Sequence, residues 1–533
     1  MDYIILSPII EKYKVQSGKL NNSTNYYFEF SETLSGGHTN KNILTNHVDN
    51  ISLFSDYSDR IQLKLTQRNI DNNDRFVFFN LKNYTEKEHT LKFSIVFINV
   101  DNFEAEDLSS YFRPPNYSER YGENKLTTPS SYIATKQGTI MLSKAIFFND
   151  NIMNYEDLTQ SITKKLIKES NPVKYYIRNG SLHINIEIKI PSGSKMDFFL
   201  LISEDLLFSS KTSLTSYFTD LETSIENNDV RFNMWIAAEG TYTKLPYSIE
   251  PFSPDAYGVS LHHMSKKELY RYYKDKQDRF FYDLMFNAII QFFGYRPSHN
   301  GLFLTDYTST WLKKDYKIRA PYIDTRLNET LSLAIQDFLK FISFPELENY
   351  HFNYADFLVE YANSGKLLVV TDGAYFFPDY FSLNLDAKVT HSSLNHQLGI
   401  LNYILDKVKL VDNKSYEIVA NSLIKAIDIT CESWIKENWD LYYKISFNDN
   451  NNLIYSENDY IYVTLIDLFL AQEKLVGLYG ESNDSIERLI LSKMKYLDTQ
   501  NFGLTDDNPK LPPNEDISSR LMAQKLALKL GYI

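Results

Sequence analysis

The hydrophobic positions in the first half of the chain recur at every second residue. Over residues 181–190, leucine and isoleucine alternate strictly with polar residues, which is the pattern of a strand with one buried face. Further apolar runs at 61–65, 76–81 and 91–98 are separated by polar links. This spacing predicts antiparallel strands in a β-sandwich-like half, interrupted by a short helix at 155–167.

The apolar period changes to 3.6 residues beyond the prolines at 246, 251 and 254, which is helical spacing. We therefore expect an α+β fold with a β-rich domain over residues 1–255 and a helical domain over residues 256–533. Eight helices with short links predict four α/α-hairpins in an incomplete toroid. The expected helices cover residues 265–293, 325–343, 353–363, 392–410, 414–437, 459–480, 484–498 and 516–530.

Length and charge narrow the class of protein. A chain of 533 residues is too long for one ordinary hydrophobic core, so more than one domain is expected. Lys+Arg 55 against Asp+Glu 68 gives a net charge of −13, and no basic block is visible. A nucleic-acid partner is therefore not expected, although a local basic pocket would still allow an anionic substrate.

The single cysteine and the apolar stretches bear on the compartment. Cys431 lies in an apolar helical stretch, where it is expected to be a buried apolar residue rather than a nucleophile. Residues 198–208 form the longest apolar stretch, and charged residues interrupt it. We expect a cytoplasmic protein with no signal peptide and no membrane span.

Polar and aromatic residues gather at 305–311 and 320–329, just ahead of an amphipathic helix. Thr325 is the expected N-cap of that helix, and loops at helix entrances are common places for binding and catalysis. The alternative is that an aspartate and an arginine of this run only cap the helix and pair with each other. The residues expected at this helix mouth are Tyr307, Trp311, Tyr322, Asp324, Arg326 and Asn328.

A second group of candidates opens the helix expected at 392–410. His391 and Asn395 fall on a stripe beside the apolar one, and the positive end of a helix dipole favours a neutral imidazole that can accept a proton. The loop before it carries Asp372, Asp379 and Tyr380, and carboxylates beside aromatic rings are typical of a sugar subsite. The alternatives are a capping histidine and an aromatic loop that packs on the helices with its carboxylates in solvent.

Two more carboxylates, Asp440 and Asp459, fall between expected helices. Such a pair supports glycoside hydrolysis if the two groups lie close together. The sequence has no Cys-x-x-Cys, no His-x-x-Glu-His, no Gly-x-Gly-x-x-Gly, no Walker A loop and no Gly-x-Ser-x-Gly. We therefore expect neither a metal nor a nucleotide cofactor.

A β-rich half followed by an incomplete α/α toroid resembles α/α-toroid carbohydrate-active proteins, in particular the uronyl (glucuronyl) C5-epimerases. The run Tyr322-Ile323-Asp324-Thr325-Arg326 resembles the Tyr-Asp-Thr-Arg stretch of the glucuronyl C5-epimerases, with Ile323 as an extra residue. The resemblance implies that a base removes the C5 proton of a uronate and an acid returns a proton from the other face. It also implies that Arg326 binds the carboxylate through two parallel hydrogen bonds.

The expected function is therefore that of an isomerase acting on an anionic polysaccharide or glycan. The alternatives are an α/α-toroid glycoside hydrolase, a polysaccharide lyase, and a glycan-binding, structural or scaffold protein without catalysis. The expected catalytic residues are Tyr307, Tyr322, Asp324 and His391, and the expected substrate-binding residues are Trp311, Arg326, Asn328, Asp372, Asp379, Tyr380 and Asn395.

Overall fold

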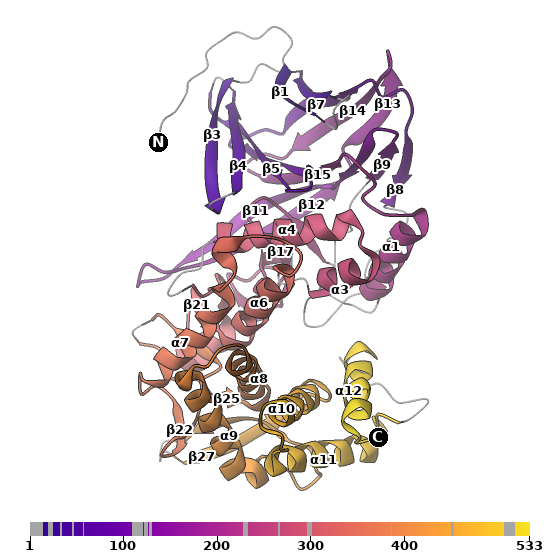
Figure 1. The fold of residues 1–533 in the computed structure, drawn as a ribbon. Helices are drawn as coiled ribbons and strands as arrows, with labels where there is room; N and C mark the ends of the chain where they lie inside the picture. The colour runs from indigo at the N-terminus through magenta and orange to yellow at the C-terminus, as the bar shows by residue number, and fades with distance from the viewer. Residues whose placement is uncertain are drawn as a thin grey trace.

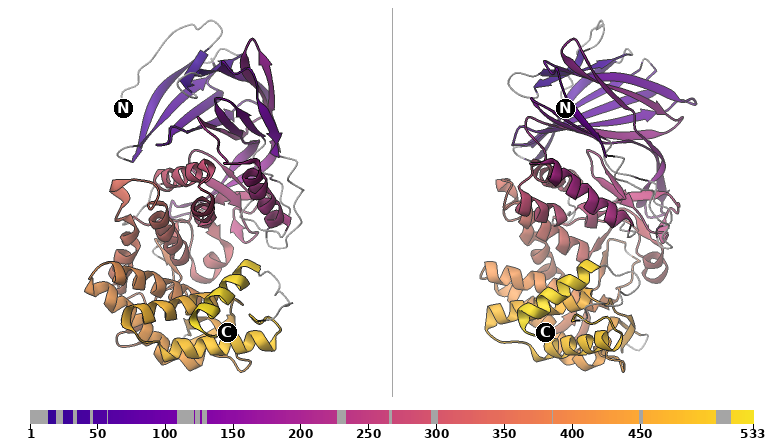
Figure 2. Two further views of the ribbon diagram at one scale, coloured as in Figure 1. Left: turned by 45° about the vertical axis from the view of Figure 1, so that its right-hand side comes forward. Right: turned by 90° about the vertical axis from the view of Figure 1, so that its right-hand side faces the viewer.

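The computed structural model places a β half above a helical half (Figure 1), and the two halves stay one above the other in two further views (Figure 2). The described residues are 14–19, 25–31, 35–44, 47–56, 58–108, 121, 126, 131–226, 233–264, 267–295, 301–384, 386–448, 452–505 and 517–533. Residues 449–451 of an asparagine-rich stretch, which the sequence suggests is a surface loop, lie outside them. The side chains of the adjacent pair His262 and His263, a poor metal pair by their helical spacing, also lie outside them.

Two antiparallel sheets make up most of the β half. The smaller sheet has the order β1-β2-β7-β14-β13, and the larger has thirteen strands with the main order β16-β17-β19-β12-β11-β15-β6-β5-β4-β3, with β10, β9 and β8 leading off β15. The strands are β1 (Lys14–Lys19), β2 (Asn25–Phe30), β3 (Ser35–Leu44), β4 (His47–Ser55), β5 (Ile61–Asn69), β6 (Arg75–Asn83), β7 (His89–Ile98), β8 (Glu104–Asp107), β9 (Ser131–Thr135), β10 (Gly138–Leu142), β11 (Ala145–Asn154), β12 (Gln160–Ser170), β13 (Val173–Arg178), β14 (Ser181–Ile190), β15 (Lys195–Ser203), β16 (Met234–Ile236), β17 (Thr241–Lys244) and β19 (Ala256–Val259).

The alternation over 181–190 is the buried pattern of β14. Every leucine and isoleucine of this strand is buried, and its polar residues are not. Its apolar face meets Ile95 and Phe97 of β7 on the same sheet, and the larger sheet supplies residues such as Phe79 and Phe198 to the same apolar core. The predicted strands at 61–65, 76–81 and 91–98 are β5, β6 and β7.

The helix predicted at 155–167 is wrong. These residues hold a turn and most of β12, which pairs with β11 from Gln160 to Ser170. The isoleucines at 162 and 167 lie at 42% and 40% exposure, so the apparent helical spacing does not mark a buried face. Pairing along the whole length of β11 decides the conformation, which is a tertiary contact that the local pattern does not carry. The β half also contains one helix that was not predicted, α1 (Lys211–Glu226).

The helical half matches the expected helices closely. The stretch predicted at 265–293 divides in two near Gln277, which has a positive φ of 57°, and the seven-residue α5 was not predicted. The helices are α2 (Leu261–Met264), α3 (Lys267–Lys276), α4 (Arg279–Gly294), α5 (Thr310–Tyr316), α6 (Thr325–Phe338), α7 (Asn353–Ala362), α8 (Leu394–Leu410), α9 (Lys414–Trp434), α10 (Val463–Tyr479), α11 (Asp484–Thr499) and α12 (Ile517–Leu530), with 3₁₀ turns at Pro345–Leu347 and Tyr350–Phe352.

The long helices pack in two rows. Helices α4, α6, α8, α10 and α12 contact one another in succession, while α7, α9 and α11 form a second row against them. This arrangement agrees in part with the predicted incomplete toroid. Among the described residues, no helix is long and apolar enough to cross a membrane.

Short strands link the helices at one end of the rows. They were not predicted, because two to six residues are too few for a periodic pattern. They are β18 (Ile249–Glu250), β20 (Thr308–Ser309), β21 (Tyr322–Asp324), β22 (Leu368–Thr371), β23 (Ala374–Phe376), β24 (Tyr380–Ser382), β25 (Ser392–Ser393), β26 (Tyr442–Phe447) and β27 (Leu453–Asn458).

Strands within and after the proline-rich segment at 246–254 connect the large sheet to the helical half. Strand β19 pairs with β12 and β17 in the large sheet, and β18 pairs with β20 of the helical half. The last strand of the large sheet therefore ends at Val259, and helices begin at Leu261.

A buried arginine joins the two halves. Arg68 of β5 is 1% exposed, and its guanidinium donates to both carboxylate oxygens of Asp49 at 3.0 and 2.6 Å. It also donates to Asn287 of α4 at 2.6 Å. Around this contact, α4 packs its apolar residues on the outer face of the large sheet.

Replacement of Arg68 by alanine would leave Asp49 buried without its cation. We expect Arg68→Ala to lower the free energy of unfolding by about 3–5 kcal/mol, measured by chemical denaturation. The matched control is Arg60→Ala, which removes an exposed arginine and is expected to change stability by no more than about 0.5 kcal/mol. Equal effects of the two variants would contradict the role given to Arg68.

Candidate functional site

The segments that lead into α6 and α8 meet at one end of the helical rows. Strand β21 pairs with β24, which sets Asp324 opposite Tyr380, and the backbone N–H of Asp379 donates to the carbonyl of His391 at 3.0 Å. The structure thus brings together the two groups of residues singled out at 322–326 and 391–395. We call the following residues the helix-mouth cluster: Trp311, Tyr322, Asp324, Asp379, Tyr380, His391, His396 and Tyr443.

Asp379 is the buried anion of this cluster. Its side chain is fully buried, and it accepts from the backbone N–H of Ser393 at 2.9 Å and from the Ser393 hydroxyl at 2.6 Å. Burial opposes ionisation, but the nearby His396 and His391 and the Ser393 hydroxyl together lower the pKa of Asp379 below its ordinary value. The cluster therefore contains a fixed negative charge.

The hydrogen bonds around His396 select one tautomer. The hydroxyl of Thr325 donates to the backbone carbonyl of Asp379 at 3.0 Å, so its oxygen accepts at 2.7 Å from Nδ1–H of His396. A neutral His396 then has its lone pair on Nε2. Among the described residues, none hydrogen-bonds to that nitrogen. His396 was not among the expected site residues.

His391 is held from both sides. Its Nδ1 lies 2.9 Å from the Tyr316 hydroxyl, and its Nε2 lies 3.3 Å from Oδ2 of Asp379. The imidazole of His396 lies on the other carboxylate oxygen, with Nδ1 3.7 Å from Oδ1. One buried carboxylate therefore lies beside two histidines, although Nε2 of His391 makes no hydrogen bond with the described residues. His391 is 2% exposed and His396 is 7% exposed, so His391 is the less accessible of the two.

Asp324 is the N-cap of α6, and the prediction that Thr325 caps this helix is wrong. The Asp324 side chain accepts from the backbone N–H of Leu327 at 3.0 Å, while Thr325 turns toward His396 and Asp379. Burial is the largest influence on Asp324 and raises its pKa, with Asp379 adding to the rise and His396 opposing it. Asp324 and Asp379 thus have pKa values displaced in opposite directions, which is the pattern of an acid beside a fixed anion.

Aromatic rings surround these polar groups. The ring of Tyr380 lies 5.6 Å from Trp311, 6.0 Å from Tyr322 and 6.0 Å from His396. Tyr443 of β26 lies 6.2 Å from His391. Trp311, Tyr380 and Tyr443 are half-buried, so none of the three is sealed in the core.

The tyrosine hydroxyls of this region are kept protonated. Burial raises the pKa of Tyr322, Tyr380 and Tyr443 above the ordinary value, and nearby carboxylates add to the rise in each of Tyr380 and Tyr443. Tyr307 is affected in the same way by burial and by Asp324. These hydroxyls are therefore donors at neutral pH.

Arg326 binds two carboxylates of the protein, and the expected alternative that it pairs with Asp324 is wrong. Its Nη2 donates to both oxygens of Asp467 in α10 at 2.8 and 2.9 Å. Its Nη1 donates to Glu329 at 3.0 Å. The arginine ties α6 to α10, with 27% of its side chain exposed.

Other expected binding residues have structural partners. The side-chain amide of Asn328 donates to Phe303 and Asp324 carbonyls and accepts from the Phe303 N–H, so it fixes the chain ahead of α6. Asp372 lies in the exposed turn between β22 and β23, where its carbonyl accepts from Lys425. Asn395 is buried, and its Oδ1 has no hydrogen-bond partner among the described residues.

The two interhelix carboxylates are part of an ion-pair network. Lys493, which is fully buried, lies 2.6 Å from Asp440 and 2.9 Å from Asp459. The same carboxylates were considered as a hydrolytic pair, and they do lie on one ammonium group. A shared buried cation is the arrangement of a structural anchor. No three described His, Cys, Asp or Glu side chains are arranged to hold a metal ion.

Known proteins offer distant similarities of fold. No protein-family model and no curated protein match the chain. A family 76 glycoside hydrolase from a bovine Bacteroides thetaiotaomicron strain is 12% identical, with 86% of this chain and 83% of that chain covered and a TM-score of 0.41. Cellobiose 2-epimerase from Bacillus thermoamylovorans is 11% identical, with 59% and 82% covered and a TM-score of 0.39. Similarity at these TM-scores assigns neither family nor activity to this chain.

Asp324→Asn tests the raised pKa of this carboxyl. Asparagine caps a helix as well as aspartate does, and it has no charge to desolvate. Because the pKa of Asp324 is raised on folding, its ionisation favours the unfolded state. We expect the variant to match the wild type in acid and to gain Tm over it as pH rises above the ordinary aspartate range. Thermal denaturation across pH, with the exposed Asp315→Asn as control, measures this difference. A variant less stable at neutral pH would contradict it.

Gly399→Ala tests the packing of Arg326 against α8. A Cβ at Gly399 would lie closer than 3.0 Å to Arg326 and to Glu329, whose ends are held in ion pairs. We expect a loss of about 1–3 kcal/mol in the free energy of unfolding. Gly477→Ala in α10 meets nothing within 4 Å and should instead gain up to about 1 kcal/mol. A neutral Gly399→Ala would show that Arg326 is free to move.

Proposed function

We propose that this protein is a carbohydrate-active enzyme that transfers protons at the helix-mouth cluster. The observation that carries the proposal is the hydrogen-bond chain from the Asp379 carbonyl through Thr325 to His396, which leaves the lone pair of Nε2 without a partner among the described residues. His396 is the proposed base, and Asp324, whose pKa burial raises, is the proposed acid. A base and an acid held near one another by fixed hydrogen bonds are the requirement for moving a proton off and onto a bound molecule.

The aromatic surroundings favour a sugar as that molecule. Trp311, Tyr380 and Tyr443 present half-buried rings around the two proton carriers. The C–H groups of a sugar ring pack on such faces, and the protonated tyrosine hydroxyls can bind its hydroxyl groups. This combination of stacking surface and proton carriers distinguishes the helix mouth from the ion-paired Asp440 and Asp459.

The proposed reaction is an epimerisation or isomerisation. His396 Nε2 takes the proton from a carbon beside a carbonyl or carboxyl group, and the electrons of the broken C–H bond move into that group. Asp324, or water in exchange with it, then returns a proton to the carbon, and the electrons flow back to form the new C–H bond. The Asp379 carboxylate stabilises the imidazolium that forms between the two steps.

The uronate C5-epimerase form of the proposal keeps Arg326 as the group that binds the sugar carboxylate. A uronate would then compete with Asp467 and Glu329 for a guanidinium that both already occupy. A neutral sugar would not have to displace these carboxylates from Arg326. Because the guanidinium is already occupied, we favour a neutral sugar as the substrate. With a neutral sugar, Arg326 positions α6 and does not touch the substrate.

Glycoside hydrolysis is the alternative enzyme. It needs a second carboxylate that faces the sugar, whereas both oxygens of Asp379 already accept hydrogen bonds from Ser393. A polysaccharide lyase would begin with the same proton abstraction as the proposed epimerase. It would then expel the neighbouring glycosidic oxygen, whereas the epimerase returns a proton to the carbon. A glycan-binding protein without catalysis would use the same rings and would leave the protons of the sugar untouched.

The decisive test is solvent-proton exchange in deuterium oxide. Incubation with a set of neutral and uronate-containing oligosaccharides should place deuterium on one ring carbon, and His396→Gln should lower that rate by about 100-fold or more. The matched control is His183→Gln, on the polar face of β14, which should leave the rate unchanged. Release of reducing ends without exchange would indicate hydrolysis. Absence of both, with binding retained, would contradict the enzyme proposal.

A further inference from the structure

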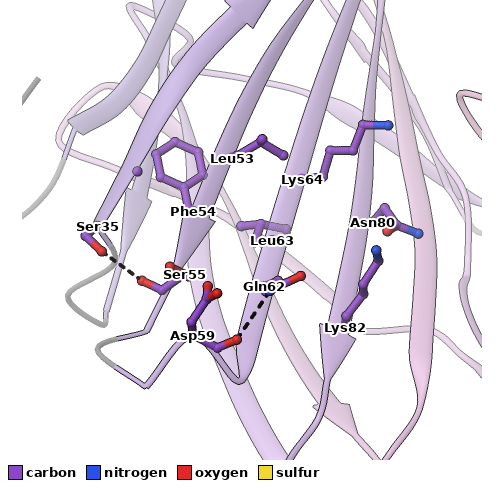
Figure 3. Close-up of a pocket in the computed structure, with 11 residues that line it drawn as sticks. Ser35, Leu53, Phe54, Ser55, Asp59, Gln62, Leu63, Lys64, Asn80 and Lys82 are labelled. Carbon is purple, nitrogen blue, oxygen red and sulfur yellow. Dashed lines mark hydrogen bonds between the residues drawn. The ribbon is translucent and has the colours of Figure 1, made fainter. Parts of the chain in front are cut away.

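A hollow lies in the β half, lined by none of the residues of the helix-mouth cluster. Figure 3 shows it on the large sheet, where β3, β4, β5 and β6 run side by side. Its volume is about 340 Å³, which is at the lower end of the range of pockets that bind small molecules. The residues that line it are Ser35, Gly36, Leu53, Phe54, Ser55, Asp59, Gln62, Leu63, Lys64, Asn80 and Lys82.

Strand register places the polar side chains of the hollow in two rows. In one row Gln62 lies opposite Lys82, which lies opposite Lys195. In the next row Lys64 lies opposite Asn80. Residues two apart on a strand point to the same face, so amides and ammonium groups from neighbouring strands share one surface.

The cations of this surface differ in their partners. Lys64 pairs with Glu239 at 2.6 Å, and Lys195 pairs with Asp150. Lys82 has no ion pair or hydrogen bond with any of the residues that the structure describes. In Figure 3 the Lys82 side chain lies between Gln62 and Asn80. In a chain with a net charge of −13, it is a local site for an anionic group.

One wall of the hollow suits a sugar ring. Leu53, which lies opposite Lys64, is 45% exposed and offers an apolar face, whereas its neighbour Phe54 points into the buried core of the sandwich. The amide of Gln62 donates to the Asp59 carbonyl at 3.3 Å, and that of Asn80 donates to Asp197 at 2.7 Å. The remaining donor and acceptor positions of these amides, together with the hydroxyls of Ser35 and Ser55, can bind the hydroxyls of a sugar. Part of this shape depends on Gly36, because a Cβ there would clash with the backbone of Leu53 and the ring of Phe54.

We propose that this hollow binds a carboxylate-bearing sugar unit, with Lys82 on the carboxylate and the amides on the hydroxyls. The site takes no part in catalysis, and it holds a glycan or its acidic branch on the β half. The inference rests on the residues of the hollow alone, so it stands whether or not the helix-mouth cluster transfers protons.

The test measures the binding of D-glucuronate to the full chain by NMR or calorimetry. D-glucose and acetate are the comparison probes. The wild type should bind glucuronate more tightly than either, because only glucuronate offers both the ring and the charge. Lys82→Gln should weaken glucuronate binding by about tenfold or more, and Leu53→Glu should abolish it by bringing a negative charge to the exposed wall. The control Lys87→Gln removes an exposed lysine outside the hollow and should leave binding unchanged.

The outcomes separate this site from the helix mouth. Binding that persists in His396→Gln and is weakened by Lys82→Gln supports the hollow as a separate site. Equal binding of acetate and glucuronate would reduce it to a simple anion site and overturn the sugar assignment. Undetectable glucuronate binding, or binding that Lys82→Gln and Leu53→Glu leave unchanged, would overturn the proposal altogether.

Discussion

The buried carboxylate of Asp379 is the constraint on which the arrangement of the helix mouth depends. An ionised group with no solvent contact needs hydrogen bonds from every side. Ser393 supplies two of them from the start of α8, and the backbone carbonyl of the same aspartate binds Thr325 at the start of α6. One residue of a connecting loop therefore holds the beginnings of two helices in a fixed relation.

This constraint also organises the chemistry. With Thr325 donating to the Asp379 carbonyl, the Thr325 oxygen is left to accept from His396, and the tautomer follows from that. Asp324, one residue before Thr325, is at the same time the cap of α6 and the neighbour of a buried anion, which contributes to its raised pKa. The packing of the helices and the proton affinities of the cluster thus have a common cause.

The ion pairs of Arg326 fix a third helix, α10, to the two helices that Asp379 holds together. A guanidinium between Asp467 and Glu329 is already neutralised, so its role is to fix α6 against α10. Gly399 leaves the space in α8 that this contact occupies. The charge that a uronate would need is therefore scarce at the helix mouth, whereas the hollow on the β half offers Lys82 without a partner among the described residues.

Periodicity predicted most of the fold, because long helices and half-buried strands repeat their burial pattern many times. It failed at 155–167, where pairing of β12 with β11 decides the conformation, and at the short strands between helices. The segments singled out from the sequence are also brought together by the fold, since Tyr322, Asp324, Asp379, Tyr380 and His391 lie close to one another.

The roles within the mouth were harder to predict than its location. His396 was not among the expected site residues, and the role that we propose for it rests on a contact with Thr325, 71 positions away in sequence. Glu329 is three residues from Arg326 on the same helix, but the other partner of Arg326, Asp467, is 141 positions away. The long-range hydrogen bonds to Thr325 and Asp467 leave no local pattern, so only the folded chain identifies them.

The tautomer of His396 tests the central claim most directly. Nitrogen-15 NMR of the imidazole distinguishes a protonated from an unprotonated ring nitrogen at neutral pH. The account predicts a proton on Nδ1 and a lone pair on Nε2 in the wild type, and a loss of this preference in Thr325→Val, which removes the accepting oxygen while keeping the side-chain volume. A proton on Nε2 of neutral His396 in the wild type would contradict the account, because the proposed base would then have no lone pair to offer.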